Sequence, residues 1–221
     1  MNTRALHDPN PDLRNLGDTE GTEILRLARS SIEHGLAHRE PLPVNCEGLP
    51  LELTEPAATF TTLHCEGKLR GCCGTLEAVR PLAEDVTHSA FRAAFRDVRF
   101  EPVGQHEVDA IGLEVAVLSP LESIPCSDEA DLLSRLTPGA DGLVIVADGR
   151  RATFLPKVWE TLPDPRQFLA ALKAKCGLAE DYWSERLEFQ RYRTASYAES
   201  QNQNGDSDFK CQANLRGLPG T

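Results

Sequence analysis

The sequence contains no long hydrophobic run, and Leu143–Ala147 is among its longest apolar stretches. A helix needs about 20 consecutive apolar residues to cross a bilayer, so we expect no membrane partner. The opening residues, MNTRALHDPNPDLRN, also lack the apolar core of a secretory signal. These two absences predict a cytoplasmic protein.

Positive charge is scarce as well, because 23 Lys and Arg residues face 34 Asp and Glu residues, giving a net charge of -11 at pH 7. Proteins bind nucleic acids by displacing phosphate counterions with their own cations. The charge balance therefore argues against a nucleic-acid partner. Hydrophobic residues make up 40% of the chain and charged residues 26%, which is ordinary for a globular protein with a core.

Hydrophobic periodicity predicts helices near residues 19–36, 81–95 and 165–176. Alternation and β-branched residues predict strands at 57–65, 69–75, 112–118, 143–147, 152–155 and 187–194. Short turns at Glu66–Lys68 and Asp148–Arg150 join four of these strands into two hairpins. Hairpins mixed with helices, without a regular βαβ alternation, indicate an α+β fold.

Composition changes near both ends of the chain. Residues 1–17 contain two prolines and many polar residues, which predicts a flexible arm. Residues 197–221 are almost devoid of large apolar residues, which predicts a disordered tail. The folded domain is therefore expected to span residues 18–196.

The segment KLRGCCGTL, residues 68–76, is the strongest candidate for chemistry. Its adjacent thiols, Cys72 and Cys73, permit several interpretations. A zinc site is disfavoured because no pair of cysteines has the usual Cys-x2-4-Cys spacing. A disulfide between neighbouring cysteines would require a strained backbone and an oxidising environment. A nucleophilic thiol and a merely structural corner both remain open.

A nucleophilic thiol needs cationic or N–H groups nearby. Strand alternation predicts that Arg70 shares a face with Cys72, and Gly71 and Gly74 could expose N–H groups towards an anion. A general base is not specified by the pattern. His64 and His88 are candidates by proximity in the sequence alone.

A second pair of charged residues, Asp97 and Arg99, lies in the segment RDVRF. The simpler interpretation is a structural ion pair that ends the preceding helix. The alternative is that Arg99 reaches the Cys72 turn and holds a carboxylate or phosphate there, for which its forked guanidinium is suited.

Four motifs occur in order along the chain: LRGCCGT at 69–75, AFRDVRF at 94–100, GLVI followed by ATFLPKVW within 142–159, and FLAALKAKCGL at 168–178. Together they resemble the AmmeMemoRadiSam system protein A family, also called the AMMECR-type domain, over about residues 24–194. The resemblance implies an α+β fold with a single strongly curved, mostly antiparallel sheet, flanking helices and two similar halves. It also implies a Memo-like, dioxygenase-type protein and a radical-SAM protein as partners.

The hallmark of that family is an Arg-Gly-Cys-aliphatic-Gly-Thr turn, which Arg70, Gly71, Cys72, Gly74 and Thr75 match. Cys73 stands in the aliphatic position, which suggests that it points inward as a small hydrophobic residue. Cys72 is then the candidate catalytic residue. The candidates for substrate binding are the remaining residues of the two motifs: Arg70, Gly71, Gly74, Thr75, Asp97 and Arg99.

These observations lead to two hypotheses of function. In the first, the chain is an enzyme or enzyme component that acts on a small organic molecule through Cys72. In the second, it is a non-catalytic binding or scaffold module for the Memo-like and radical-SAM proteins. No metal or cofactor is assigned to either.

Overall fold

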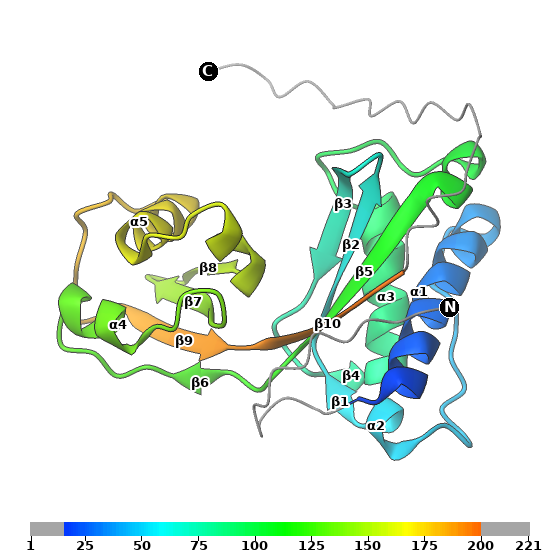
Figure 1. Ribbon diagram of the computed structural model, residues 1–221, viewed down its shortest axis with the longest axis horizontal. Coiled ribbons are helices and arrows are strands. Elements are labelled where there is room, and N and C mark those ends of the chain that lie inside the picture. Colours follow the sequence, from blue (N-terminus) through cyan, green and yellow to red (C-terminus); the bar gives the residue numbers. More distant parts are fainter. Residues whose placement is uncertain (1–15, 200–221) are drawn as a thin grey trace. The chain divides into compact units, whose positions relative to one another are not determined.

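A computed structural model describes residues 16–199. The predicted arm (1–17) and tail (197–221) therefore lie almost entirely outside the described residues. The chain divides into two compact units (Figure 1). The first comprises the residues up to Leu118 and those from Ala195 onward, and the second is the continuous segment Ser119–Thr194.

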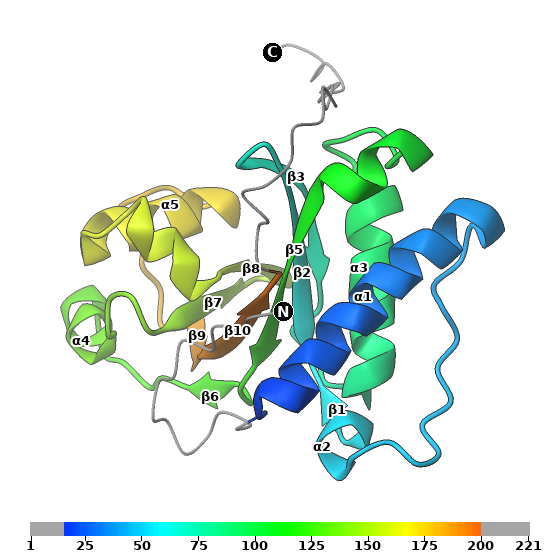
Figure 2. The ribbon, with the colours of Figure 1, turned by 45° about the vertical axis from the view of Figure 1, so that its right-hand side comes forward.

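The first unit is built on a four-stranded sheet in the order β10-β5-β2-β3. Its strands are β2 (Thr59–Cys65), β3 (Lys68–Gly74), β5 (Ile111–Leu118) and β10 (Thr194–Ala198). Helices α1 (Asp18–His38) and α3 (Leu82–Phe95) lie side by side on one face of the sheet, as Figures 1 and 2 show. The unit is completed by short elements: α2 (Leu51–Thr54), the 3-10 helix η1 (Gln105–Ala110), and the paired strands β1 (Pro56–Ala57) and β4 (Arg80–Pro81).

Apolar spacing explains the two long helices. In α1 the buried residues Ile24, Ala28 and Ile32 recur every four positions and form the stripe that packs inward. In α3 the buried residues follow the same spacing from Leu82 to Ala94. The boundaries of the two helices differ from the predicted ranges, 19–36 and 81–95, by at most two residues.

The hairpin of β2 and β3 places the thiol motif on the edge of the sheet. Glu66 (φ 51°) and Gly67 (φ 74°) form its turn, and two consecutive residues with positive φ are typical of a two-residue hairpin loop. The pairing is regular except at one point, where Leu63 lies opposite Gly71 but His64 lies opposite Leu69. Arg70 is therefore the extra residue of a β-bulge.

The second unit has its own four-stranded sheet, in the order β6-β9-β7-β8. The strands are β6 (Glu122–Ser123), β7 (Gly142–Ala147), β8 (Arg150–Phe154) and β9 (Glu188–Tyr192); the helices are α4 (Glu129–Arg135), η2 (Pro156–Glu160) and α5 (Pro165–Lys175). Its core is separate and includes Trp159 stacked on Phe168, with ring centroids 3.7 Å apart. Within residues 16–199, no helix combines the length and apolar content required to cross a bilayer.

The predicted α+β class with antiparallel pairing and flanking helices is confirmed. The single sheet is not observed, because the strands are divided among three sheets. The two large sheets belong to different units. Each of them packs on its own cluster of buried apolar residues.

The predicted tail boundary at residue 197 also needs correction. Tyr197 is part of β10 and is buried, and its hydroxyl donates to the Leu16 carbonyl at 3.2 Å. Glu199 accepts a hydrogen bond from the Leu113 N–H and pairs with Arg29. These two polar anchors extend the fold to the end of the described residues.

Candidate functional site

The two adjacent thiols of β3 point to opposite faces of the sheet. Cys72 lies opposite Thr62, whose hydroxyl donates a hydrogen bond to the Cys72 Sγ at 3.5 Å. Cys73 lies opposite Thr61 and packs against the core beneath α3. Burial, reinforced by the nearby Asp97 carboxylate, raises the pKa of the Cys73 thiol. Both cysteines are half-buried: Cys73 packs against the core, and Cys72 is the thiol of the other face.

Both Cys72 and Cys73 carry free thiols, so they form no disulfide with each other. Across the described part of the chain, no three His, Cys, Asp or Glu side chains are grouped so that they could hold a metal ion.

The segment after α3 clamps the main chain of Cys72. Because β3 is an edge strand, alternate N–H and C=O groups point away from the sheet and need other partners. The Cys72 N–H donates to Asp97 Oδ2 at 2.9 Å, and Arg99 Nη2 donates to the Cys72 carbonyl at 3.4 Å. Asp97 and Arg99 thus occupy the position that a neighbouring strand would take.

Asp97 and Arg99 also form an ion pair with two parallel hydrogen bonds. Arg99 Nε donates to Asp97 Oδ1 at 2.9 Å and Arg99 Nη2 donates to Asp97 Oδ2 at 2.7 Å. Burial favours a raised pKa for the Asp97 carboxyl, but the hydrogen bonds from Arg99 and from the Cys72 N–H outweigh it, and the pKa is lowered. The structural ion pair and the contact with the Cys72 turn are therefore both present.

Arg70 lies at the bulge, where the strand alternation that placed it on the face of Cys72 is interrupted. Its side chain is 5% exposed and binds Glu107 through two hydrogen bonds, Nε to Oε1 at 2.9 Å and Nη2 to Oε2 at 3.0 Å. The guanidinium also lies over the Phe100 ring at 5.9 Å. Arg70 anchors η1 to the bulge, and Arg99 is the arginine beside the thiol.

The two glycines of the motif permit close backbone contacts. A Cβ on Gly71 would lie 2.2 Å from the Ala93 carbonyl oxygen of α3. A Cβ on Gly74 would lie 2.2 Å from the Thr59 carbonyl oxygen and 2.4 Å from the Phe60 ring. Both glycines therefore determine how closely β3 approaches its neighbours.

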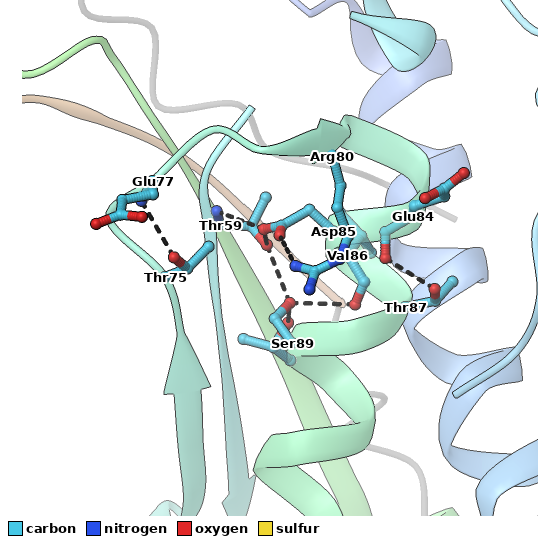
Figure 3. Close-up of polar contacts among 10 residues, drawn as sticks. Thr59, Thr75, Glu77, Arg80, Glu84, Asp85, Val86, Thr87 and Ser89 are labelled. Carbon is cyan, nitrogen blue, oxygen red and sulfur yellow. Dashed lines mark hydrogen bonds and ion pairs between the residues drawn. The ribbon is translucent and has the colours of Figure 1, made fainter. Parts of the chain in front are cut away.

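Thr75 ends the motif in a turn rather than beside the thiol. Its N–H donates to the Thr59 carbonyl at 3.0 Å, and its hydroxyl accepts from the Glu77 N–H at 3.1 Å. Figure 3 shows this turn next to the buried Asp85, whose Oδ2 accepts from the Thr59 N–H at 2.9 Å and the Thr59 hydroxyl at 2.7 Å. Burial raises the pKa of the Asp85 carboxyl, although the Thr59 hydrogen bonds oppose the shift.

The two histidines considered as bases lie in different places. His64 is on β2, two residues from Thr62 and on the same face. His88 belongs to α3, which packs on the face of Thr59 and Thr61 through Ser89. Burial lowers the pKa of His88. His64 is thus the histidine on the face of Cys72.

Thr62 and Glu107 were missed at the sequence level. If the hairpin had no bulge, the register counted from its turn would place Thr61 opposite Cys72. The bulge shifts the register by one residue, so that Thr62 lies opposite Cys72. Only a register that includes the bulge could have identified Thr62. Nothing in the sequence around Glu107 marks it as the partner of Arg70.

Comparisons with known proteins agree on one family. The AMMECR1 family model matches residues 25–197. Protein MJ0810 of Methanocaldococcus jannaschii is 35% identical over 188 residues, covering 81% of this chain and 90% of that protein. A protein of Methanothermobacter thermautotrophicus is 36% identical over 75% of this chain and 86% of its own length. The crystal structure of the uncharacterized protein PH0010 from Pyrococcus horikoshii superposes with a TM-score of 0.78 at 31% identity, covering 83% of this chain and 93% of that one.

Proposed function

The chain belongs to the AMMECR1 family, and from this premise we propose that it is an enzyme or enzyme component that acts on a small organic molecule through the Cys72 thiol. One observation carries the proposal: the free thiol of Cys72 accepts a hydrogen bond from Thr62 while its main chain is held by Asp97 and Arg99. The thiolate is the nucleophilic form of cysteine, and the Thr62 hydroxyl is placed to donate a hydrogen bond to the sulfur.

Arg99 is suited to hold an anionic group of the substrate. Its side chain is 51% exposed although Nε and Nη2 are engaged by Asp97. The ion pair with Asp97 raises the pKa of Arg99 and keeps the guanidinium charged and oriented. The buried Arg70 is instead a supporting residue. Gly71, Gly74 and Thr75 shape the turn that presents the thiol.

A metabolite-profiling experiment tests this proposal. The purified chain is incubated with a small-molecule cell extract, and mass spectrometry follows which compounds are consumed or formed. We expect a specific change with wild type and with Cys73→Ala, and none with Cys72→Ala. The proposal fails if Cys72→Ala produces the same change as wild type, or if no compound changes with any variant.

A second function, a binding module for the Memo-like and radical-SAM proteins, is favoured by the exposed Val98. This apolar side chain is 82% exposed between Asp97 and Arg99, on the segment that covers the edge of β3. We expect Val98→Asp to weaken binding to either partner by at least about tenfold, as loss of a central apolar contact does. Unchanged binding in a surface-immobilisation assay, or no binding by wild type, contradicts this function.

A further inference from the structure

The sheet face turned away from α1 and α3 carries a row of polar side chains. Thr62 of β2 lies opposite Cys72 on β3 and opposite Glu114 on β5. Residues directly opposite on antiparallel strands project to the same face, with Cβ atoms about 4.5–5.5 Å apart. A thiol, a hydroxyl and a carboxylate therefore lie side by side across three strands, and all three residues are half-buried.

His64 adds an imidazole to this face. It follows Thr62 by two positions on β2 and is therefore on the same side of the sheet. Glu114 is its diagonal neighbour on β5, a separation of about 7–8 Å that an aromatic side chain can span. On β3 Leu69 lies directly opposite His64, and the bulge at Arg70 lies between this pair and the pair of Thr62 and Cys72. The residue directly opposite His64 on β5 is Gly112, which has no side chain to crowd the ring.

The other side of the row is bounded by an apolar ring. Phe60 lies opposite Gly74, and its ring atoms come within 2.4–2.6 Å of where a Gly74 Cβ would stand. The ring therefore covers the glycine and lies next to the Cys72 row.

We propose that this face is the catalytic surface of the chain, with His64 as the base that takes the thiol proton of Cys72 and Glu114 as the residue that positions and stabilises the imidazolium. The inference rests on the proposed function and names the residues that would carry it out. The S–H bond of Cys72 breaks and an N–H bond forms on His64, while the electron pair stays on sulfur. The Thr62 hydroxyl donates to the resulting thiolate, and the Glu114 carboxylate balances the charge of the imidazolium.

The rate at which iodoacetamide modifies Cys72 tests this arrangement in the full chain. Alkylation forms an S–C bond and releases iodide, and fragment ions of the tryptic peptide Gly71–Arg92 separate modification of Cys72 from that of Cys73. We expect His64→Gln to lower the Cys72 rate at pH 6.5 by at least about tenfold and to shift its pH profile upward. Glu114→Gln should lower the rate severalfold in the same direction.

The matched control is His88→Gln, because His88 lies on α3 and not on this face. It should leave the rate unchanged. The charged pair nearest the thiol, Asp97 and Arg99, is the same in all variants, so a change reports on His64 or Glu114. Thermal unfolding midpoints within about 3 °C of wild type, a shift worth less than about 1 kcal/mol, show that the variants are folded.

The outcomes distinguish this inference from the proposed function. If Cys72 reacts rapidly in wild type and equally rapidly in folded His64→Gln, the base is not His64 and the inference is overturned while the nucleophile stands. If Cys72 reacts no faster than free cysteine in wild type, the proposed function itself fails. If His64→Gln does not fold, the Cys72 alkylation rates of His64→Asn and Glu114→Gln are used instead. Rates equal to that of wild type in both variants reject the inference.

Discussion

At the scale of single residues, close backbone contacts in the thiol motif leave no space for a larger side chain at Gly71. Gly71 is buried where β3 meets α3, and a Cβ there would lie 2.2 Å from the Ala93 carbonyl oxygen. The clash is with backbone, which cannot rotate away as a side chain can. Gly71 thus explains why a glycine precedes the thiol whether or not it contacts a substrate.

Gly71→Ala should therefore destabilise the protein. Overpacking of a core typically costs about 1–3 kcal/mol, and we expect the upper end of that range because helix and strand must separate. Urea unfolding at pH 7 measures the change in free energy. Lys68→Ala, at an exposed position of the same strand, should change it by less than about 0.5 kcal/mol. Equal stability of Gly71→Ala and wild type would contradict the packing described here.

The buried ion pair of Arg70 and Glu107 gives a second prediction at this scale. Glu107→Gln leaves the buried guanidinium without a counter-charge, and we expect a loss of about 3 kcal/mol at pH 7. The matched control is Glu122→Gln, which breaks the exposed pair with Arg191 and should cost less than about 1 kcal/mol.

The same pair should make stability depend on pH. Burial favours a raised pKa for Glu107, but the hydrogen bonds from Arg70 and the Gly104 N–H outweigh it and lower the pKa. Because the pKa of Glu107 is lower in the folded state, its ionised carboxylate stabilises the fold at pH values above the unfolded-state pKa of about 4.3. This stabilisation is lost as the pH falls through the folded-state pKa. Wild type should lose more stability than Glu107→Gln between pH 7 and acidic pH. Parallel pH curves would rule out this contribution.

At the scale of elements, periodicity in the sequence predicts much of the fold. The stripe of Ile24, Ala28 and Ile32 predicts α1, and the residues around Glu66–Gly67 predict the hairpin turn. Short elements such as α4 and β6 carry too few residues to show a period and were not predicted. Tyr197 was assigned to the tail because its anchor, the Leu16 carbonyl, is distant in sequence.

The candidate site was predictable only in part for the same reason. The KLRGCCGTL motif drew attention to Cys72, and the RDVRF motif drew attention to Asp97 and Arg99, which contact the Cys72 main chain. The bulge at Arg70 changes which side chain faces the thiol, and a one-residue shift reverses the faces of a strand. Thr62 and the true partner of Arg70 therefore follow from tertiary structure and not from spacing.

Asp85 joins α3 to β2 through hydrogen bonds, so its removal should lower the free energy of unfolding. Its carboxylate accepts the Thr59 N–H and hydroxyl at the start of β2 from the first turn of α3 (Figure 3). Asp85→Ala leaves the Thr59 N–H without its acceptor and takes one of the two partners of the Thr59 hydroxyl, and an unsatisfied buried group costs about 1–3 kcal/mol. We expect a loss of at least about 2 kcal/mol in urea unfolding.

The control for this prediction is Glu84→Ala, which removes the neighbouring carboxylate in the same helical turn. Its loss should be less than about 1 kcal/mol, the usual size of a helix-dipole contribution. Similar losses in the two variants would mean that the hydrogen bonds to Thr59 do not join β2 to α3 as described.

At the scale of the whole molecule, the chain leaves the first unit after β5 and returns to it at β10. These two strands are neighbours in the sheet, and Ser119 and Arg193 are hydrogen-bonded where the second unit begins and ends. The second unit is therefore an insertion whose two ends lie close together. Insertions of this kind can be removed when the remaining core is intact.

Replacing Ser119–Thr194 with a short Gly-Ser linker should leave the first unit folded. Its core residues come from segments outside the insertion, so the apolar burial that stabilises it is retained. We expect a cooperative thermal transition and the helical circular dichroism of α1 and α3. A chain without a cooperative transition would show that the first unit needs the second for its stability.

The most direct test of the account is the relative reactivity of the two adjacent thiols. Both cysteines are half-buried, but Cys72 accepts a hydrogen bond from the Thr62 hydroxyl, whereas Cys73 packs against the core and the pKa of its thiol is raised. Iodoacetamide modification of the folded chain at pH 7, followed by peptide mass spectrometry, measures both rates in one sample. The account predicts that Cys72 reacts at least about tenfold faster than Cys73. Equal rates, or faster modification of Cys73, would contradict the assignment of Cys72 as the reactive thiol.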